Sequence, residues 1–225
     1  MCPSGIRNLA LAALTLCLAA PLRAAELSKA ETAKFLDDLR AHRAKNPSLT
    51  ADFNEEKTTR LLNKPLVTSG TLAFQVPNKF RREIKGKTGS LTVSNGQKLW
   101  IHYPSFKEVE LYQLGQRPFF DDSIAALTAG LNVQNIAEFY TYKVHAEGDG
   151  YRIALTPKSG GLKRMLKELT VWLGSDFEVQ RTEALLPKGD RMVTSYRGQR
   201  ATPLPASTFE FSPPADAHVS EPLGK

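Results

Sequence analysis

The residue types that carry out most enzyme chemistry are present in this sequence but stand apart from one another. None of the four histidines has the spacing to a carboxylate or thiol that a metal site requires. The sequence contains no glycine-rich phosphate loop and no Gly-x-Ser-x-Gly nucleophile motif. We therefore expect no metal, no cofactor and no covalent nucleophile. The scattered histidines are His42, His102, His145 and His218.

Two pairs of neighbouring carboxylates, Asp121–Asp122 and Glu55–Glu56, are candidates for general acid–base catalysis, and neither pair suits it. Asp121 and Asp122 precede a helical pattern, where two sequence neighbours point in different directions and carboxylates favour the helix start. Glu55 and Glu56 lie in a strand pattern, which sends one carboxylate to each face. The sequence therefore predicts a protein that is not an enzyme. An enzyme with an unrecognised site is the alternative.

The N-terminus has the features of an export signal. Arg7 precedes an apolar run of 12 residues from Leu9 to Ala20, which is too short to span a bilayer as an ordinary helix. Small residues follow, so we expect residues 1–25 to be a signal peptide cleaved near Ala24 or Ala25. Residues 26–225 would then form one periplasmic domain. Lipidation at Cys17 is the alternative, although Leu16 stands where such a signal needs a small residue.

The charge of the chain is moderately basic. The formal net charge is +7, and loss of Arg7 and Arg23 with the signal peptide lowers it to +5. Two basic clusters stand out, and export argues against nucleic acid as their partner. An anionic lipid head group or membrane surface is the expected partner, and a solvated surface is the alternative. The clusters are residues 79–82 with Lys85 and Lys87, and residues 163–164 with Lys167.

Hydrophobic periodicity predicts one helix at the start of the mature chain and a short helical insert in the middle. Ser28 is a plausible N-cap for a helix over Glu31–Lys45, with Leu36 and Leu39 on its apolar stripe. The insert spans residues 118–140 and includes one helix at Ile124–Gly130 and a second at Val133–Phe139.

The rest of the chain alternates with a period of two; its twelve candidate segments predict about ten or eleven antiparallel strands joined by tight turns. From Ser212 onward the tail, which includes Pro213 and Pro214, is expected to be loosely held. The expected strands are Thr50–Arg60, Leu66–Val76, Phe80–Ile84, Leu91–Val93, Lys98–Tyr103, Lys107–Tyr112, Thr141–Ala146, Gly150–Thr156, Leu166–Leu173, Phe177–Leu185, Arg191–Arg197 and Ser207–Phe211.

A sheet of this size must be covered or must curve to protect its apolar face. The sequence has rich apolar faces but little helix to cover them, which favours an open or half-closed barrel with a small helical lid. Such an arrangement leaves a hydrophobic cavity, and burial of acyl chains there would need no reactive group. A core filled by its own side chains is the alternative.

Six local strings, in order and spread over the mature chain, give this sequence a family resemblance. The chain resembles the LolA family, the periplasmic carriers of outer-membrane lipoproteins. The strings are Leu49-Thr-Ala-Asp-Phe53; Ser69-Gly-Thr-Leu72; Pro77-Asn-Lys-Phe-Arg81; Val93-Ser-Asn-Gly-Gln-Lys-Leu-Trp-Ile-His-Tyr-Pro104 with Lys107-Glu-Val109; Leu155-Thr-Pro-Lys158; and Phe209-Glu-Phe-Ser-Pro-Pro214.

The resemblance implies a single, mainly β domain, an unclosed antiparallel half-barrel of about eleven strands. The N-terminal helix and short mid-chain helices would cover a hydrophobic cavity. It implies a monomeric carrier without cofactor that takes up lipoprotein acyl chains from an inner-membrane donor complex and passes them to an outer-membrane acceptor. A lipid-binding sensor or scaffold of the same fold, or a carrier of another anionic lipid, is the alternative.

Two positions depart from the family pattern. Val76 stands before Pro77, where the family usually has an arginine that holds the lid shut. Arg82 stands where the family usually has a tryptophan. If the alternation holds, Arg82 shares a face with Phe80, and a lone cation there is costly unless it is paired. An anionic head group is one partner that we consider for Arg82; a nearby carboxylate or solvent is the alternative.

The candidate lipid-binding residues come from the strands that would line the cavity and from the helices that would cover it. Trp100 and Ile101 point to opposite faces of one strand, so only one of them can face inward, and the sequence does not decide which. The cavity candidates are Phe53, Leu72, Phe74, Phe80, Arg82, Trp100 and Ile101, and the lid candidates are Leu36, Leu39, Ile124 and Leu127.

Overall fold

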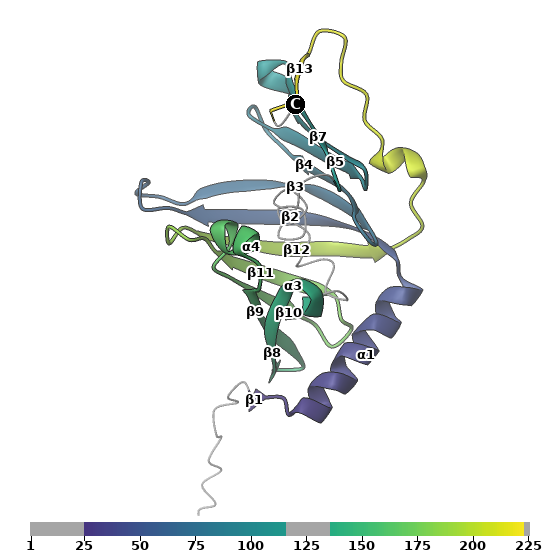
Figure 1. Cartoon of the computed structure of the whole chain (residues 1–225), viewed down its shortest axis with the longest axis vertical. Helices are drawn as coiled ribbons and strands as arrows, with labels where there is room; N and C mark the ends of the chain where they lie inside the picture. The colour runs from purple at the N-terminus through teal and green to yellow at the C-terminus, as the bar shows by residue number, and fades with distance from the viewer. Residues whose placement is uncertain (1–24, 116–135, 223–225) are drawn as a thin grey trace, which may run out of the picture.

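The computed structural model describes residues 25–115 and 136–222. These residues form one curved sheet of 13 strands whose two edge strands do not pair with each other (Figure 1). The strand order is β1-β8-β9-β10-β11-β12-β2-β3-β4-β5-β6-β7-β13. All neighbours are antiparallel except β13 and β7, which are parallel. The unclosed, mainly β architecture predicted from the sequence is thus confirmed.

Eleven strands, β2 to β12, form the body of the sheet, and a very short strand lies at each edge. The short edge strands β1 and β13 are not predicted by the sequence pattern. The strands are β1 (Ala25–Glu26), β2 (Ser48–Thr58), β3 (Leu66–Gln75), β4 (Lys79–Ile84), β5 (Ser90–Asn95), β6 (Lys98–Tyr103), β7 (Glu108–Gln113), β8 (Tyr140–Glu147), β9 (Gly150–Pro157), β10 (Glu168–Leu173), β11 (Val179–Leu185), β12 (Arg191–Ala201) and β13 (His218–Ser220).

The N-terminal helix α1 (Lys29–Lys45) begins with the predicted capping box. The Ser28 side chain accepts a hydrogen bond from the Glu31 backbone N–H, and the Glu31 carboxylate accepts one from the Ser28 backbone N–H. Leu36 and Leu39 are buried on the side of the helix that packs against the sheet. The helix therefore starts two residues earlier than predicted and ends at the predicted lysine.

One face of the sheet, which we call the inner face, carries α1, α3 (Ile136–Phe139) and α4 (Gly160–Met165). The strand register places Val144, Ile153 and Val171 in one row, and this row continues through Thr182 and Thr194 to Glu55. A second row crosses the other half of the sheet on the same face and consists of Leu49, Phe74, Phe80, Ser94, Leu99 and Tyr112.

Two apolar clusters occupy this inner face. The helix cluster joins Leu36 and Leu39 of α1 to strands β8 to β11 and to α3 and α4. The strand cluster lies on β2, β3, β4 and β6 and consists of Leu49, Ala51, Phe53, Leu72, Phe74, Phe80 and Leu99. Leu72 and Phe74 of β3 thus share one face with Phe80 of β4, as the period-two pattern of the two strands predicts.

The C-terminal segment contradicts two predictions. Ser207–Phe211 is not a strand, because Pro205 starts a short 3-10 helix, η3 (Ala206–Phe209), that buries Phe209 on the outer face, beside β4 and β5. The tail beyond Ser212 is not loosely held, because His218 donates a backbone hydrogen bond of 2.7 Å to the Lys107 carbonyl. The Lys107 ammonium also lies 3.0 Å from the Asp216 carboxylate.

The helical predictions were incomplete in the second half of the chain. Of the helix predicted at Val133–Phe139, the described residues contain α3, and the helix predicted at Ile124–Gly130 lies outside them, as does the predicted signal peptide up to residue 24. Helix α4 was missed because its two glycines disfavour a helix in isolation; Ser159 caps it by accepting a hydrogen bond from the Leu162 N–H. Within residues 25–115 and 136–222, no helix is long and apolar enough to cross a membrane.

Candidate functional site

Seven of the eleven predicted site residues contribute apolar side chains to the inner face. Leu36 and Leu39 belong to the helix cluster. Phe53, Leu72, Phe74 and Phe80 belong to the strand cluster, and Ile101 is half-buried against it. Alternation places these side chains on one face of each strand, and the pairing of the strands brings together residues that lie far apart in the chain.

Trp100 does not join the other candidates, and its inclusion among them requires correction. The register pairs Trp100 with Val93 and Leu111 on the outer face, and its ring lies 6.3 Å from the ring of Phe211. Ile101 and Leu99 face inward instead. Trp100 faces outward because of a tertiary contact: the C-terminal segment folds over this part of the outer face and gives Trp100 an aromatic neighbour there. Of the lid candidates, Ile124 and Leu127 lie outside the described residues.

A small polar cluster separates the two apolar clusters, and Arg82 is at its centre. The Arg82 Nη2 lies 3.0 Å from the Glu55 Oε2, and the Thr194 hydroxyl donates a 3.1 Å hydrogen bond to the same oxygen. The Arg82 guanidinium also lies over the Phe53 ring, 4.3 Å from its centroid. Arg82 is therefore not a lone cation, which removes the physical reason for expecting an anionic head group beside it.

Tyr196 of β12 completes the polar cluster from the neighbouring strand. Its hydroxyl lies 3.4 Å from the Thr182 hydroxyl, and the ring packs between the two apolar clusters. Removal from water raises the pKa of the Tyr196 phenol above its ordinary value of 10.0. The phenol is therefore neutral at physiological pH, so the only opposite charges within the cluster are those of Glu55 and Arg82.

Val76, the second departure from the family pattern, has an apolar role in this structure. Its side chain is half-buried against the strand cluster, and its backbone N–H donates a 2.9 Å hydrogen bond to the Pro47 carbonyl. Arginine is absent here, so a hydrogen-bonded latch from this position is absent as well.

A pocket of about 550 Å³ opens where the first half of α1 passes over β8, and it falls in the roughly 300–1,000 Å³ range of small-ligand sites. Leu36, Tyr142 and Val144 form an apolar part of its wall, and charged side chains from β1, α1 and β8 form much of the remainder. Sequence reasoning missed Tyr142 and Val144 as site residues. The period-two pattern of this segment could have identified them.

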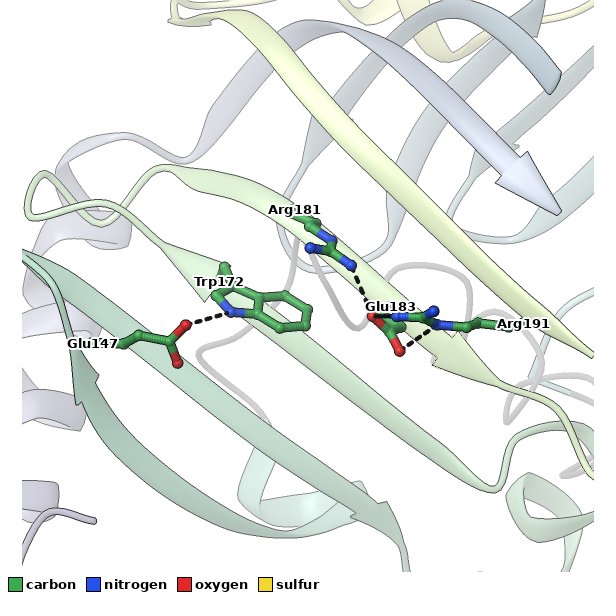
Figure 2. A network of polar contacts seen from close by, with 5 residues as sticks. All are labelled: Glu147, Trp172, Arg181, Glu183 and Arg191. Carbon is green, nitrogen blue, oxygen red and sulfur yellow. Dashed lines mark hydrogen bonds and ion pairs between the residues drawn. The ribbon is translucent and has the colours of Figure 1, made fainter. Parts of the chain in front are cut away.

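The outer face of the same half of the sheet carries a polar network (Figure 2). The Trp172 indole donates a 3.3 Å hydrogen bond to Glu147, and the Arg181 guanidinium lies over the Trp172 ring. Glu183 accepts hydrogen bonds from Arg181 and from both Nε and Nη2 of Arg191. The network therefore joins side chains of β8, β10, β11 and the start of β12.

Glu183 should make the stability of the protein depend on pH. Hydrogen bonding by Arg191 holds the pKa of Glu183 below its ordinary value of 4.5, so its contribution is present above pH 4.5 and is lost as the pH falls through the lowered pKa. We expect Glu183→Gln to lower the free energy of unfolding by about 1 kcal/mol at pH 7, a value reduced for solvent screening. Urea unfolding from pH 7 to pH 3 measures this difference.

The control for this prediction is Asp38→Asn, which breaks the exposed Lys34–Asp38 pair of α1. We expect a change below about 0.5 kcal/mol at any pH in that series. A deficit of Glu183→Gln that stayed constant down to pH 3 would contradict a role for the Glu183 charge.

The described part of the chain offers no group of three or more His, Cys, Asp or Glu side chains placed to hold a metal ion. The arrangement of the inner face instead suits binding of an apolar ligand: two apolar clusters, a charge-balanced polar cluster between them, and a pocket beside α1. These features need no reacting group.

The chain is similar in sequence to known lipoprotein carrier proteins. The family described as outer membrane lipoprotein carrier protein LolA matches residues 44–212. The outer-membrane lipoprotein carrier protein of Dechloromonas aromatica is 32% identical over 175 residues, 76% of this chain and 80% of the relative. That of Chromobacterium violaceum is 30% identical over 203 residues, 90% and 95% of the two chains. The crystal structure of the LolA superfamily protein NE2245 from Nitrosomonas europaea gives a TM-score of 0.45 at 14% identity, over 80% and 97% of the chains. The chain belongs to the LolA family of outer membrane lipoprotein carrier proteins.

Proposed function

We propose that this chain is an exported carrier that binds the acyl chains of lipoproteins on its inner face and delivers them toward the outer membrane. Residues 1–25 would be the signal peptide and residues 26–225 the carrier domain in the periplasm. Membership of the lipoprotein carrier family supports this role. An inner-membrane donor complex and an outer-membrane acceptor are the partners that such a role requires. The role is one of binding and release without covalent chemistry.

The observation that carries the proposal is the apolar character of the inner face. Apolar side chains occupy it on both halves of the sheet, and α1, α3 and α4 pack on the helix cluster. An acyl chain that enters such an environment gains about 0.8 kcal/mol for each methylene removed from water. Binding strength would therefore come from chain length and would tolerate different lipoprotein sequences.

The proposed contacts follow from the placement of the side chains. Phe53, Leu72, Phe74, Phe80 and Ile101 would contact the acyl chains, and Leu36 and Leu39 would hold α1 over them. The pocket beside α1, which Leu36 lines, would serve as part of this space.

Two neighbouring residues of β6 provide a matched test of which face binds the cargo. Ile101 faces the strand cluster and Trp100 faces outward. We expect the photoreactive residue p-benzoyl-phenylalanine to cross-link to a triacylated lipoprotein when it replaces Ile101. The same replacement of Trp100 should give at least tenfold less cross-linking, because its side chain lies across the sheet from the acyl chains. The yield of cross-linked product on a gel measures both.

Two further measurements complete the test. Lipid extraction from protein purified without detergent should release acylated material, identified by mass spectrometry. Circular dichroism should show that both photoreactive variants are folded. Equal cross-linking from the two positions, or stronger cross-linking at Trp100, would refute the proposed binding face.

A further inference from the structure

The tip of the β2–β3 hairpin exposes large apolar side chains that the fold does not use. Leu61 is 92% exposed, and Leu62, Leu66 and Val67 are each more than half exposed. None of the four belongs to the helix cluster or the strand cluster. In Figure 1 the hairpin extends beyond the neighbouring strands on the left. A group of exposed apolar residues on a protruding tip costs solubility and is typical of an interaction surface.

The same tip is purely cationic. Residues 57–67 contain Lys57, Arg60 and Lys64 and no carboxylate. Among the described residues, neither Arg60 nor Lys64 has a carboxylate within ion-pair distance. Leucines flanked by cations, without acidic neighbours, match the chemistry of an anionic lipid surface, where apolar side chains enter the interface and cations meet the head groups.

The antiparallel topology extends the basic character along one end of the sheet. Five connections lie at the strand ends beside this hairpin tip: 59–65, 85–89, 104–107, 158–167 and 186–190. Together they contain ten Lys or Arg residues and a single carboxylate, Asp190. One of the ten, Lys107, is paired with Asp216 of the C-terminal segment. The basic clusters that include Lys87 and Lys167, separate in sequence, both contribute to this end.

Four described turns at the opposite end of the sheet have the opposite character. The turns 76–78, 96–97, 148–149 and 174–178 contain no Lys or Arg and three carboxylates, Asp149, Asp176 and Glu178. Among these described connections, the cations are therefore concentrated at one end, whereas a solubilising surface would spread them evenly; at the other end, Lys79 and Lys98 begin the strands that follow two of the turns.

The β11–β12 turn stands directly beside the hairpin tip. β12 pairs with β2 so that Arg191 is opposite Thr58. A Cβ on Gly189, where φ is +89°, would lie 3.2 Å from the Arg60 Nη2. Lys188 of this turn is exposed and adds its charge to that of Arg60. The tip is thus a cationic surface built from two adjacent hairpins, with leucines at its most exposed point.

We propose that this end of the sheet docks the protein onto an anionic membrane surface, with Leu61 and Leu62 entering the lipid interface. The inference goes beyond the proposed carrier function, because docking requires no bound cargo. Arg60, Lys64 and Lys188 meet the anionic head groups, and the hairpin backbone stays at the water boundary. The carrier is held at a membrane by contacts separate from the inner face that would hold the acyl chains.

Vesicle co-sedimentation tests the proposal with protein purified from the periplasm. The probes are vesicles of phosphatidylethanolamine with phosphatidylglycerol, compared with vesicles of phosphatidylcholine alone. We expect binding to the anionic vesicles only. The double variant Leu61→Asn/Leu62→Asn should bind at least tenfold more weakly, because apolar burial is lost. The double variant Arg60→Gln/Lys64→Gln should bind about 25-fold more weakly, because each lost charge lowers the affinity about fivefold.

Matched controls carry the same chemical changes elsewhere on the surface. Val219→Asn removes an exposed apolar side chain on β13, and Lys98→Gln removes an exposed cation at the opposite end of the strands. Both should bind like the wild-type protein. In Leu61→Trp, the indole fluorescence should shift to shorter wavelength on anionic vesicles and should be quenched by brominated acyl chains.

Three results would overturn the proposal. One is equal binding of wild-type protein to anionic and neutral vesicles, or no binding to either. Another is wild-type affinity of both double variants for anionic vesicles. The third is self-association of the wild-type protein in sedimentation that Leu61→Asn/Leu62→Asn abolishes, without vesicle binding, because the tip would then bind a second copy. Cross-linking of cargo at Ile101 is measured separately, so failure of docking is distinguishable from failure of the carrier function.

Discussion

Replacing Leu39 by alanine is expected to lower the free energy of unfolding by about 3 kcal/mol, within the roughly 2–5 kcal/mol range of buried leucine truncations. Leu39 is fully buried where α1 meets the sheet. Truncation loses the transfer free energy of the removed methyl groups and leaves a cavity that the stiff strands beneath cannot fill. Urea denaturation followed by circular dichroism measures the loss.

The matched control is the same change at an exposed leucine. Leu61→Ala should alter the free energy of unfolding by less than about 0.5 kcal/mol, since Leu61 is 92% exposed on the hairpin tip. A small effect at Leu39 would mean that α1 does not pack firmly on the sheet in solution. Such a result would also weaken the proposal that α1 covers bound acyl chains.

The substitution Glu55→Gln removes the carboxylate of the Glu55–Arg82 ion pair. It is expected to lower the free energy of unfolding by about 2–3 kcal/mol. Removing one partner of a fully buried pair costs roughly 3–5 kcal/mol, and this pair retains some exposure, with side chains 16% and 21% accessible. In Glu55→Gln the Arg82 cation stays among apolar side chains without a counter-charge. The Thr194 hydroxyl keeps an acceptor in the glutamine carbonyl, so the loss reports mainly on the charge.

The second half of this test removes the stranded cation as well. The double variant Glu55→Gln/Arg82→Met should regain most of the lost stability, because no unpaired charge remains. Its free energy of unfolding should lie within about 1 kcal/mol of the wild-type value. The two substitutions are therefore expected to be strongly non-additive in a double-mutant cycle of urea denaturation.

A surface pair provides the reference for this cycle. The exposed Asp37–Arg40 pair of α1 should show a coupling free energy below about 0.5 kcal/mol in a double-mutant cycle of Asp37→Asn and Arg40→Met. If the effects of Glu55→Gln and Arg82→Met simply added, the two groups would not be interacting on the inner face. Arg82 would then again be available to an anionic ligand.

Local signals in the sequence predicted much of the fold. Strand β6 has its predicted bounds, because alternation and the preceding Asn-Gly turn both act over a few residues. The start of α1 was predicted nearly as well, since the capping box is a contact between residues three apart. Ser207–Phe211 was mispredicted because an alternating pattern does not reveal whether a strand has a neighbour to pair with.

The sequence by itself determined the period of each element, the unclosed β architecture and the alternation that places Phe80, Arg82 and Ile84 on one face. Only the tertiary structure decided that Ile101 faces inward, that Glu55 pairs with Arg82, and that Lys87 and Lys167, from separate basic clusters, lie at one end of the sheet. The physical reason is the distance along the sequence over which each kind of interaction acts. Backbone preferences and periodicity act between near neighbours, whereas the choice of face and of charge partner depends on which strands pair and what covers them.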